Sequence, residues 1–189
     1  MAVKEVIRMG HPTLRLTAET MSLEEIQAPE TSELIQDLFD TMQKEQGIGI
    51  AAPQINISKQ IALVGLPPEV EEGEEDQGEE EDIPILVVIN PKIEAIEETL
   101  QGFWEGCLSV PGLRGFVKRP RKIKANFLDA SGAPQEIILE GFLATIFQHE
   151  IDHLFGKLYV DRVEDPTLLS YNEEFEKHIA GTENDPEED

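Results

Sequence analysis

Two histidines and one glutamate lie close together in the run His149-Glu150-Ile151-Asp152-His153. The flanking residues are mostly apolar, so we expect this run to lie on a helix. In a helix, residues four apart are separated by about 400° of rotation, and both imidazoles project from nearly the same side. Two nitrogen ligands at this spacing can bind one divalent ion, and Glu150 can take a proton from a water on that ion. The run therefore indicates a metal-dependent hydrolase.

An alternative interpretation is that the two histidines are core residues that lie four apart by chance. An apolar helix that buries two imidazoles and a carboxylate without partners loses about 1–3 kcal/mol for each unpaired group. One shared cation satisfies all three groups, so the metal site is favoured. This histidine–glutamate motif occurs in several unrelated hydrolases, and the third protein ligand must distinguish among them.

Two residues compete for the position of third ligand. Glu173 lies twenty residues after His153 and follows Asn172, as in a thermolysin-like peptidase, but the Ser-Asp that usually follows is missing and the chain is short for that fold. Cys107 is the only cysteine, in the run Glu105-Gly-Cys-Leu-Ser-Val-Pro111. A solitary cysteine is more often a small buried hydrophobe. Its small and turn-forming neighbours, however, would let the backbone approach an ion closely, and thiolate ligation by Cys107 is expected.

A third segment, Gly47-Ile-Gly-Ile-Ala-Ala-Pro-Gln54, follows the first predicted helix. A pair of glycines alone indicates only a turn. The small residues here would also let the backbone of a substrate come close. Gln54 could donate an amide N–H to a developing oxyanion.

The helices that position these residues can be predicted from hydrophobic periodicity. Residues 31–44 have apolar side chains at intervals of three and four, which predicts an amphipathic helix. Residues 142–155 are apolar around much of the helix circumference, which predicts a buried helix. A last amphipathic stretch is expected at 166–179, whereas the first thirty residues are expected to be irregular.

Strands are expected where short apolar or alternating runs end at glycine, proline or turn residues. Pro91 is expected to end one strand, because proline has no backbone N–H for the sheet. The run Asp129-Ala-Ser-Gly132 is typical of a hairpin turn. The expected strands are 60–65, 85–90, 92–99, 122–129 and 135–140. The predicted fold class is α+β, with antiparallel strands wrapped around a central buried helix that carries the HExxH motif.

The 189 residues fit one catalytic domain at 1–180, interrupted by an acidic insertion at 69–82 and followed by an acidic tail at 181–189. Both acidic segments are expected to be disordered. The formal net charge is −24. Without the fifteen acidic residues that we count at 69–82 and 183–189, 24 acids remain against 15 Lys and Arg, a net charge of −9.

The acidic charge argues against direct binding of nucleic acid. One cysteine excludes an intrachain disulfide and suits a reducing compartment. No run of 18 apolar residues occurs and no signal-like segment begins the sequence, so we expect a cytoplasmic protein without a membrane span.

Taken together, residues 47–54, 105–109 and 148–153 resemble the three motifs of the peptide deformylases, in the order of that family. The resemblance covers roughly residues 3–160. It implies a hydrolase that removes the N-terminal formyl group from the formyl-methionine of nascent polypeptides and releases formate. It also implies that Cys107, His149 and His153 hold one Fe²⁺, for which Ni²⁺, Co²⁺ or Zn²⁺ can substitute.

The resemblance further assigns catalytic roles. Glu150 would take a proton from the attacking water and pass it to the leaving amine. Gln54 and the backbone N–H of Leu108 would stabilise the oxyanion together with the metal. No other cofactor is implied.

The substrate-binding residues follow from their positions relative to the motifs. The backbone of Gly49 would pair with the substrate as an added strand. The methionine side chain would enter an apolar pocket formed by Ile48, Thr145 and Ile146, with Arg114 beside it. Arg114 could equally be an ordinary surface cation.

The implied partners are N-formylmethionyl nascent peptides, met in transient proximity to the ribosome. Some bacterial relatives carry a basic C-terminal helix thought to dock on the ribosome, whereas the acidic tail here would be repelled by its phosphates. The acidic insertion is a second departure from the family pattern. A purely structural metal site, with four protein ligands, remains as a further alternative.

Overall fold

The computed structural model describes residues 2–65 and 84–182 of the chain. The predicted insertion at 69–82 and the tail from residue 183 lie outside the described residues. The division into one domain, an insertion and a tail therefore stays a prediction. No helix within the described ranges is long and apolar enough to cross a membrane.

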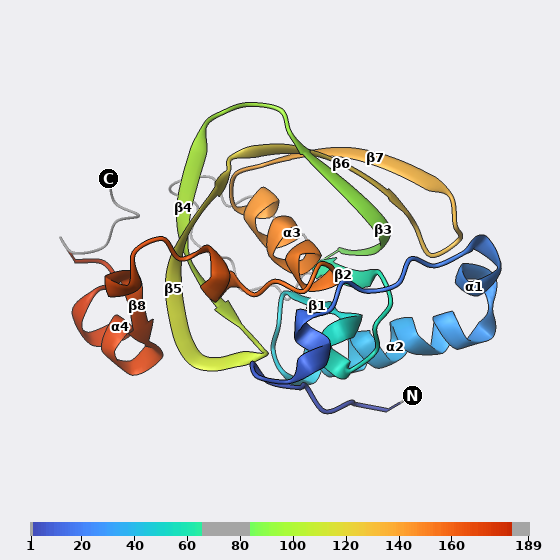
Figure 1. Ribbon diagram of the computed structural model, residues 1–189, viewed down its shortest axis with the longest axis horizontal. Helices are drawn as coiled ribbons and strands as arrows, with labels where there is room; N and C mark the ends of the chain where they lie inside the picture. Colours follow the sequence, from blue (N-terminus) through green and yellow to red (C-terminus); the bar gives the residue numbers. More distant parts are fainter. Residues whose placement is uncertain (1, 66–83, 183–189) are drawn as a thin grey trace, which may run out of the picture.

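The helices and strands follow one another along the chain as labelled in Figure 1, with β3 to β7 as five consecutive strands. The α-helices are α1 (Leu23–Gln27), α2 (Pro29–Lys44), α3 (Gly141–Leu154) and α4 (Asn172–His178). Short 3-10 helices occupy Pro12–Arg15, Ala52–Ile55, Tyr159–Arg162 and Pro166–Leu168. The strands are β1 (Gly49–Ala51), β2 (Ile61–Gly65), β3 (Ile85–Ala95), β4 (Leu100–Cys107), β5 (Val110–Pro120), β6 (Lys122–Leu128), β7 (Pro134–Glu140) and β8 (Leu169–Tyr171).

Two antiparallel sheets enclose helix α3. One sheet has the strand order β1-β2-β3-β6-β7 and the other has the order β4-β5-β8. Helix α3 lies between them at the centre of the molecule (Figure 1), and every residue from Ala144 to Leu154 is buried. The predicted α+β fold with antiparallel strands around a central buried helix is confirmed.

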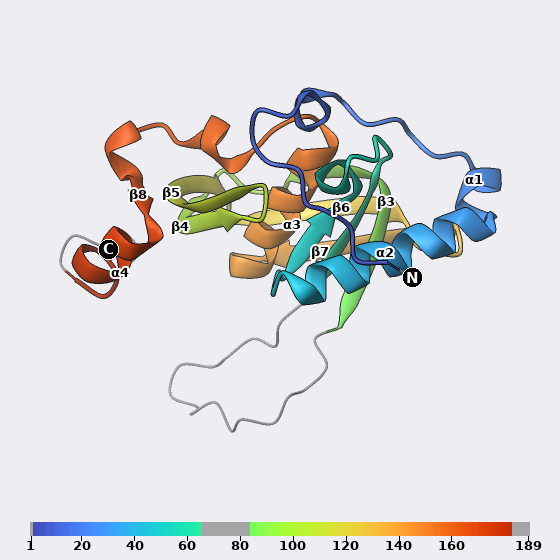
Figure 2. The same ribbon diagram turned by 90° about the horizontal axis from the view of Figure 1, so that it is seen from below.

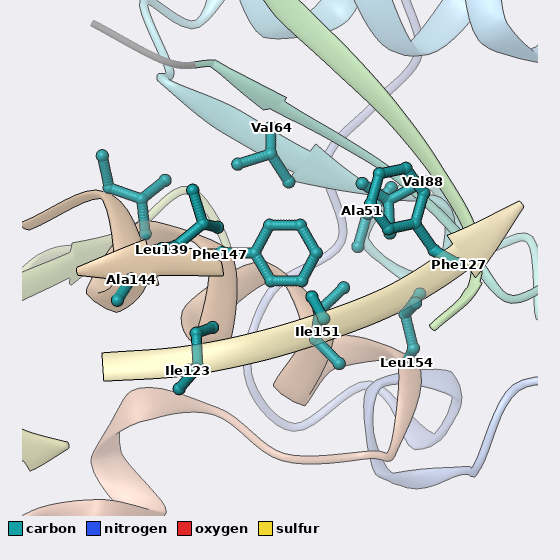
Figure 3. Close-up of a cluster of buried hydrophobic side chains, with 13 residues drawn as sticks. Ala51, Val64, Val88, Ile123, Phe127, Leu139, Ala144, Phe147, Ile151 and Leu154 are labelled. Carbon is teal, nitrogen blue, oxygen red and sulfur yellow. The ribbon is translucent and has the colours of Figure 1, made fainter. Parts of the chain in front are cut away.

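Packing on both faces of the five-stranded sheet holds α3 in place. Figure 3 shows Phe147, Ile151 and Leu154 of α3 lying among buried side chains from β2, β3 and β6. On the opposite face, α2 packs against β1, β2 and β3 (Figure 2), with Leu38 and Met42 in a second buried cluster. Each large apolar side chain buried in this way contributes about 1.5–3 kcal/mol. The close packing of α3 therefore fixes the positions of the polar residues that it carries.

The expected end of a strand at Pro91 is wrong. Strand β3 continues through Pro91 to Ala95, with a register shift between Ile89 and Lys92. Asn90 has a left-handed backbone (φ 50°), and its side chain bonds the backbone of Met21 in both directions. A bulge needs no ladder hydrogen bond at its extra residue and can therefore accommodate proline. The predicted partner strand at 92–99 is largely the second half of β3.

Other parts of the chain also differ from what the sequence predicts. The first thirty residues, expected to be irregular, contain a 3-10 helix at Pro12–Arg15 and helix α1. The stretch 166–179 is a 3-10 turn, strand β8 and helix α4 rather than one amphipathic helix. The long hairpin of β4 and β5 was not predicted, because glycines interrupt its alternation. Gly102 is required there by packing, since a Cβ at this position would lie 2.1 Å from the ring of Phe116. The predicted hairpin at 122–140 and the helices near 31–44 and 142–155 are confirmed.

Candidate active site

Strand β4 and helix α3 bring three potential metal ligands together. The side-chain donor atoms of Cys107, His149 and His153 all lie within 4.8 Å of one another. The Sγ atom of Cys107, the last residue of β4, lies 3.4 Å from Nε2 of His153. Among the described residues, this is the only group of three such side chains, and the exposed Glu173 is not part of it.

Both imidazoles are oriented through their Nδ1 atoms. Nδ1 of His149 lies 2.7 Å from a carboxylate oxygen of Glu105, and Nδ1 of His153 lies 3.2 Å from the carbonyl oxygen of Lys157. Metal-binding histidines commonly donate one ring N–H to a carboxylate or carbonyl, which fixes the ring and leaves the other nitrogen for the ion. The hydrogen bonds thus leave Nε2 of both rings available for a metal.

A buried network of charges holds Glu105 in place. The guanidinium of Arg119 donates to both oxygens of Glu105, at 2.6 and 2.9 Å, and to Asp152 at 2.7 Å. Arg162 binds the same Asp152 from outside the core. Burial alone would raise the pKa of Glu105, but Arg119 and His149 outweigh it, and the pKa lies below its usual range. Glu105 is therefore an ionised acceptor for the His149 ring.

Sequence reasoning missed this network, although one signal was available. Glu105 stands two residues before Cys107, and ligating histidines need a partner for their second nitrogen. An acidic residue beside the cysteine could have been assigned that role. Nothing in the sequence indicates that Arg119 is 2% exposed and bridges Glu105 to Asp152.

The ligand group is electrostatically suited to a cation. Burial would raise the pKa of Cys107, but His153 and His149 lower it well below its ordinary value. Burial would lower the pKa of His149, yet Cys107 and Glu105 raise it well above its ordinary value. The same negative field that favours a proton on His149 would favour a metal ion in the proton's place. One thiolate and two imidazoles fit Fe²⁺, Zn²⁺, Ni²⁺ or Co²⁺.

Glu150 lies beside the ligands with an unused oxygen. Its side chain is buried, and Oε2 has no hydrogen-bond partner among the described residues. Burial raises the pKa of Glu150, and the two histidines oppose that shift. Gly49 makes the necessary space, because a Cβ there would lie 2.5 Å from Oε1 of Glu150. A carboxyl group with a raised pKa and a free oxygen is suited to receive and return a proton.

The amide of Gln54 is held in one orientation. Its Oε1 accepts a hydrogen bond from the backbone N–H of Ala51 at 2.8 Å. Its Nε2 therefore faces Cys107 and Ser109, with Sγ at 3.5 Å and Oγ at 3.3 Å. The Nε2 group is a donor on the side of the ligand group, where an oxyanion donor is needed.

A cavity of about 640 Å³ opens over this site. Ile48 is 43% exposed at the cavity, whereas Thr145 and Ile146 are buried in its wall. Arg114 also lines the cavity and is partly buried. The predicted residues that the structure brings to this one cavity are Ile48, Gly49, Gln54, Cys107, Leu108, Arg114, Thr145, Ile146, His149 and Glu150.

Comparison with known proteins gives concordant matches over nearly the whole chain. A family model described as Polypeptide deformylase matches residues 3–168. A peptide deformylase of Leptospira biflexa is 43% identical over 176 residues, covering 93% of this chain and 96% of the relative. Peptide deformylase 1 of Bordetella pertussis is 39% identical over 171 residues, covering 90% of this chain and 93% of the relative.

Solved structures agree with the sequence matches. The chain is similar to an actinonin-bound class I type b peptide deformylase from Acinetobacter baumannii, with a TM-score of 0.75 and 34% identity. That match covers 87% of this chain and 100% of the other. A peptide deformylase from Synechococcus elongatus in complex with actinonin gives a TM-score of 0.75 at 37% identity, over 92% of this chain and 85% of the other.

Proposed function

Because the chain belongs to the polypeptide deformylase family, we propose that Cys107, His149 and His153 hold its catalytic metal and that Glu150 moves the proton. The protein is a hydrolase that removes the N-terminal formyl group from nascent peptides. The observation that carries the proposed site is the convergence of the thiol of β4 with both imidazoles of α3. Cys107, His149 and Glu150 of this group also line one cavity.

The family is metal-dependent, and we propose one Fe²⁺ per chain, for which Ni²⁺, Co²⁺ or Zn²⁺ can substitute. A bound ion would supply Lewis acidity and lower the pKa of a water. The contribution of Glu150 is to accept the proton of the attacking water and then protonate the leaving amine. Its unpaired Oε2 and raised pKa support this role.

Two donors of the chain serve the oxyanion in this proposal. The Nε2 group of Gln54 is turned toward Cys107 because Ala51 holds the other end of the amide. The backbone N–H of Leu108, which follows Cys107 and lines the same cavity, is the second donor. Loss of one such donor typically costs about 2.7–4 kcal/mol in the transition state.

The substrate backbone is proposed to extend the five-stranded sheet. Strand β1 is the edge strand of this sheet, and within the described part of the chain it pairs only with β2. The carbonyl of Ile48 accepts from Gly65 in β2, so the alternation of a strand directs the N–H and C=O of Gly49 toward the open edge. A peptide lying along that edge would pair with Gly49. Its methionine side chain is assigned to Ile48, Thr145 and Ile146, with Arg114 beside them.

The cellular setting is also a proposal. Because its substrates are nascent peptides, the enzyme is proposed to work near the ribosome. Its net charge of −24 disfavours direct contact with nucleic acid. A cytoplasmic location agrees with a metal-binding cysteine that must stay reduced.

The function is tested by formate release from formyl-Met-Ala-Ser. The protein should be prepared anaerobically or reconstituted with Ni²⁺, because a thiolate bound to ferrous iron is sensitive to oxygen. The peptide is expected to lose formate, whereas acetyl-Met-Ala-Ser should not be cleaved, because a tight site excludes the extra methyl group. Absence of formate from the reconstituted, folded protein would refute the assignment.

The roles of individual residues are tested by Glu150→Gln, Cys107→Ser and Glu173→Ala. Glu150→Gln should lower kcat by about 10²–10⁴-fold with the metal content retained. Cys107→Ser should lose the metal, whereas Glu173→Ala should keep both metal and activity. Metal loss in Glu173→Ala alone, with cleavage inside unblocked peptides, would instead support a thermolysin-like peptidase.

A further inference from the structure

The C-terminal segment from Leu169 to His178 forms part of the cavity wall. It lies beyond the residues 3–168 that the family model matches. Strand β8 pairs with β5 so that Ser170 stands opposite Arg114, and helix α4 follows immediately beside them (Figure 1). Asn172, the first residue of α4, lines the same cavity as Cys107 and Glu150.

Arg114 is held by this segment but keeps a free donor. Its guanidinium carbon lies 5.1 Å from the centre of the Phe175 ring, a cation–π contact that fixes the side chain. Phe175 is itself packed against Trp104, with ring centres 4.9 Å apart. The Nε atom of Arg114 is buried and has no acceptor among the described residues.

Asn172 presents the complementary group. Its Oδ1 atom is buried and has no hydrogen-bond donor within the described part of the chain. Arg114 and Asn172 therefore do not satisfy each other, although both line the cavity. Buried polar atoms in folded proteins are almost always paired, and the exceptions call for an explanation. One N–H donor and one oxygen acceptor in a single cavity indicate a ligand that offers the opposite pair.

We propose that Arg114 and Asn172 form a specificity subsite that binds an amide group of the formylated peptide on the C-terminal side of its methionine. The proposal rests on the proposed function. A carbonyl oxygen would accept from Nε of Arg114, and an amide N–H would donate to Oδ1 of Asn172. A carboxylate would satisfy Arg114 but would set an anion against the Asn172 oxygen. An amide is therefore the better fit for both atoms.

The place of the subsite within the cavity agrees with this direction. Gln54, Cys107 and Glu150 occupy the end at which the formyl group reacts. Arg114 is on β5, and Asn172 begins helix α4, which lies on the far side of β4 and β5 from α2 (Figure 1). The amide can be a peptide unit after the methionine or the side chain of a following Asn or Gln, and the test separates these two sources.

The test compares formyl-methionine methyl ester, formyl-Met-Ala-Ala and formyl-Met-Asn-Gln. The ester has no amide after its methionine and no carboxylate. For each variant, kcat/KM on each peptide is divided by kcat/KM on the ester. In Asn172→Leu, which preserves size and removes the acceptor, this ratio is expected to fall about three- to tenfold, mainly through KM. Asn172→Asp keeps acceptor oxygens and should retain more of the ratio. Arg114→Met should lower it as Asn172→Leu does.

Glu173→Gln is the matched control, because Glu173 is the next residue of α4 and does not line the cavity. An equal fall for both peptides identifies a backbone amide, and a larger fall for formyl-Met-Asn-Gln identifies a side-chain amide. A ratio unchanged in both Asn172→Leu and Arg114→Met would overturn the proposal. A wild-type enzyme that gains nothing from residues after the methionine would also overturn it. A wild-type enzyme inactive on every substrate would instead refute the deformylase function itself.

Discussion

Gly49 and Glu150 share a space that cannot hold both a methyl group and the carboxylate. A Cβ on Gly49 would lie 2.5–2.6 Å from three atoms of the Glu150 side chain. The glycine therefore has a role besides the backbone pairing proposed for it. It keeps Glu150 in position beside the histidines.

Gly49→Ala is expected to displace Glu150 and to lower kcat by about a hundredfold, because a shift of about 1 Å in a reacting group can have that effect. Metal content should be retained, since the three atoms nearest the new methyl group all belong to Glu150 and none to a metal ligand. Turnover of formyl-Met-Ala-Ser and metal analysis are the measurements. Gly106→Ala is the control, because a Cβ there would have no atom within 4 Å. Equal losses in the two variants would contradict the proposed displacement.

Arg119 is the residue on which the buried charge network depends. It is 2% exposed and neutralises both Glu105 and Asp152. Replacing it with methionine would leave two buried carboxylates with reduced compensation. Arg119→Met is expected to lower the free energy of unfolding by about 3–5 kcal/mol, measured by urea denaturation.

Lys118→Met, one position earlier on β5 and exposed, is the control for Arg119→Met and should change stability little. A loss below about 1 kcal/mol in Arg119→Met would show that the carboxylates find other partners or become protonated. Glu105 also fixes His149, so the variant should bind metal more weakly as well.

The individual site residues that could be predicted are those whose role is indicated by close spacing in the sequence or by a unique residue type. His149, Glu150 and His153 share one helix face, and Cys107 is the only thiol. Arg119 and Asn172 could not be predicted in the same way. Their roles arise from strand pairing and from burial, and both charged and amide side chains are common on ordinary surfaces.

The β6–β7 hairpin shows how a turn is stabilised by one carboxylate. Asp129 accepts hydrogen bonds from the backbone and hydroxyl of Ser131, from the backbone of Ala133 and from Gln135. These hydrogen bonds lower the pKa of Asp129 to about 2, and the bond from the Ser131 hydroxyl has the largest effect. Because the pKa in the folded chain lies below the ordinary value, the stabilisation is present at neutral pH and is lost on acidification.

Asp129→Ala is expected to melt at a lower temperature than the wild type at pH 6. The difference should shrink as the pH falls from about 4 toward 2, because the wild-type carboxylate is by then protonated in the unfolded state and is increasingly protonated in the folded state. Thermal melts of both proteins across this range provide the measurement. The change Asp165→Ala, at an exposed carboxylate that bonds Thr167 near the C-terminus, is a comparison outside the hairpin. A difference that grows on acidification would contradict the assignment.

Elements with one uniform pattern could be predicted, and elements built around exceptions could not. Helix α3 and the β6–β7 hairpin follow their hydrophobic periods and were expected at nearly their observed bounds. Strand β3 crosses Pro91 only because Asn90 adopts a left-handed conformation and bonds Met21, a contact between residues far apart in sequence. In β4 and β5, glycines that packing requires obscure the alternation of strand residues.

The whole molecule carries a net charge of −24, and this charge should act on its substrates at long range. A cationic peptide is attracted and an anionic one repelled before either reaches the cavity. The ratio of kcat/KM for formyl-Met-Lys-Lys over formyl-Met-Glu-Glu should therefore be highest in about 10 mM salt. It should fall toward one as the ionic strength passes about 150 mM and the Debye length shrinks to about 8 Å.

Formyl-Met-Ala-Ala is the neutral reference for this series and should depend little on salt. A ratio that does not change with ionic strength would assign any charge preference to direct contacts in the cavity, where Arg114 is the one Lys or Arg among the described lining residues. The overall architecture could be predicted as α+β from the order of its elements. Its closure around α3 by two separate sheets could not, because β8 joins β5 from a distant part of the sequence.

The single sulfur at the end of β4 also determines how the protein responds to oxidants. Cys107 is the only cysteine of 189 residues, so a sulfenic acid formed on it has no second thiol in its own chain with which to condense. Recovery must come from an external reductant, or the residue proceeds to irreversible sulfinic acid. The same uniqueness makes the thiol easy to count: once the metal is removed and the chain is unfolded, a thiol-reactive dye can label only this position. The label then gives the fraction of chains whose Cys107 is still reduced.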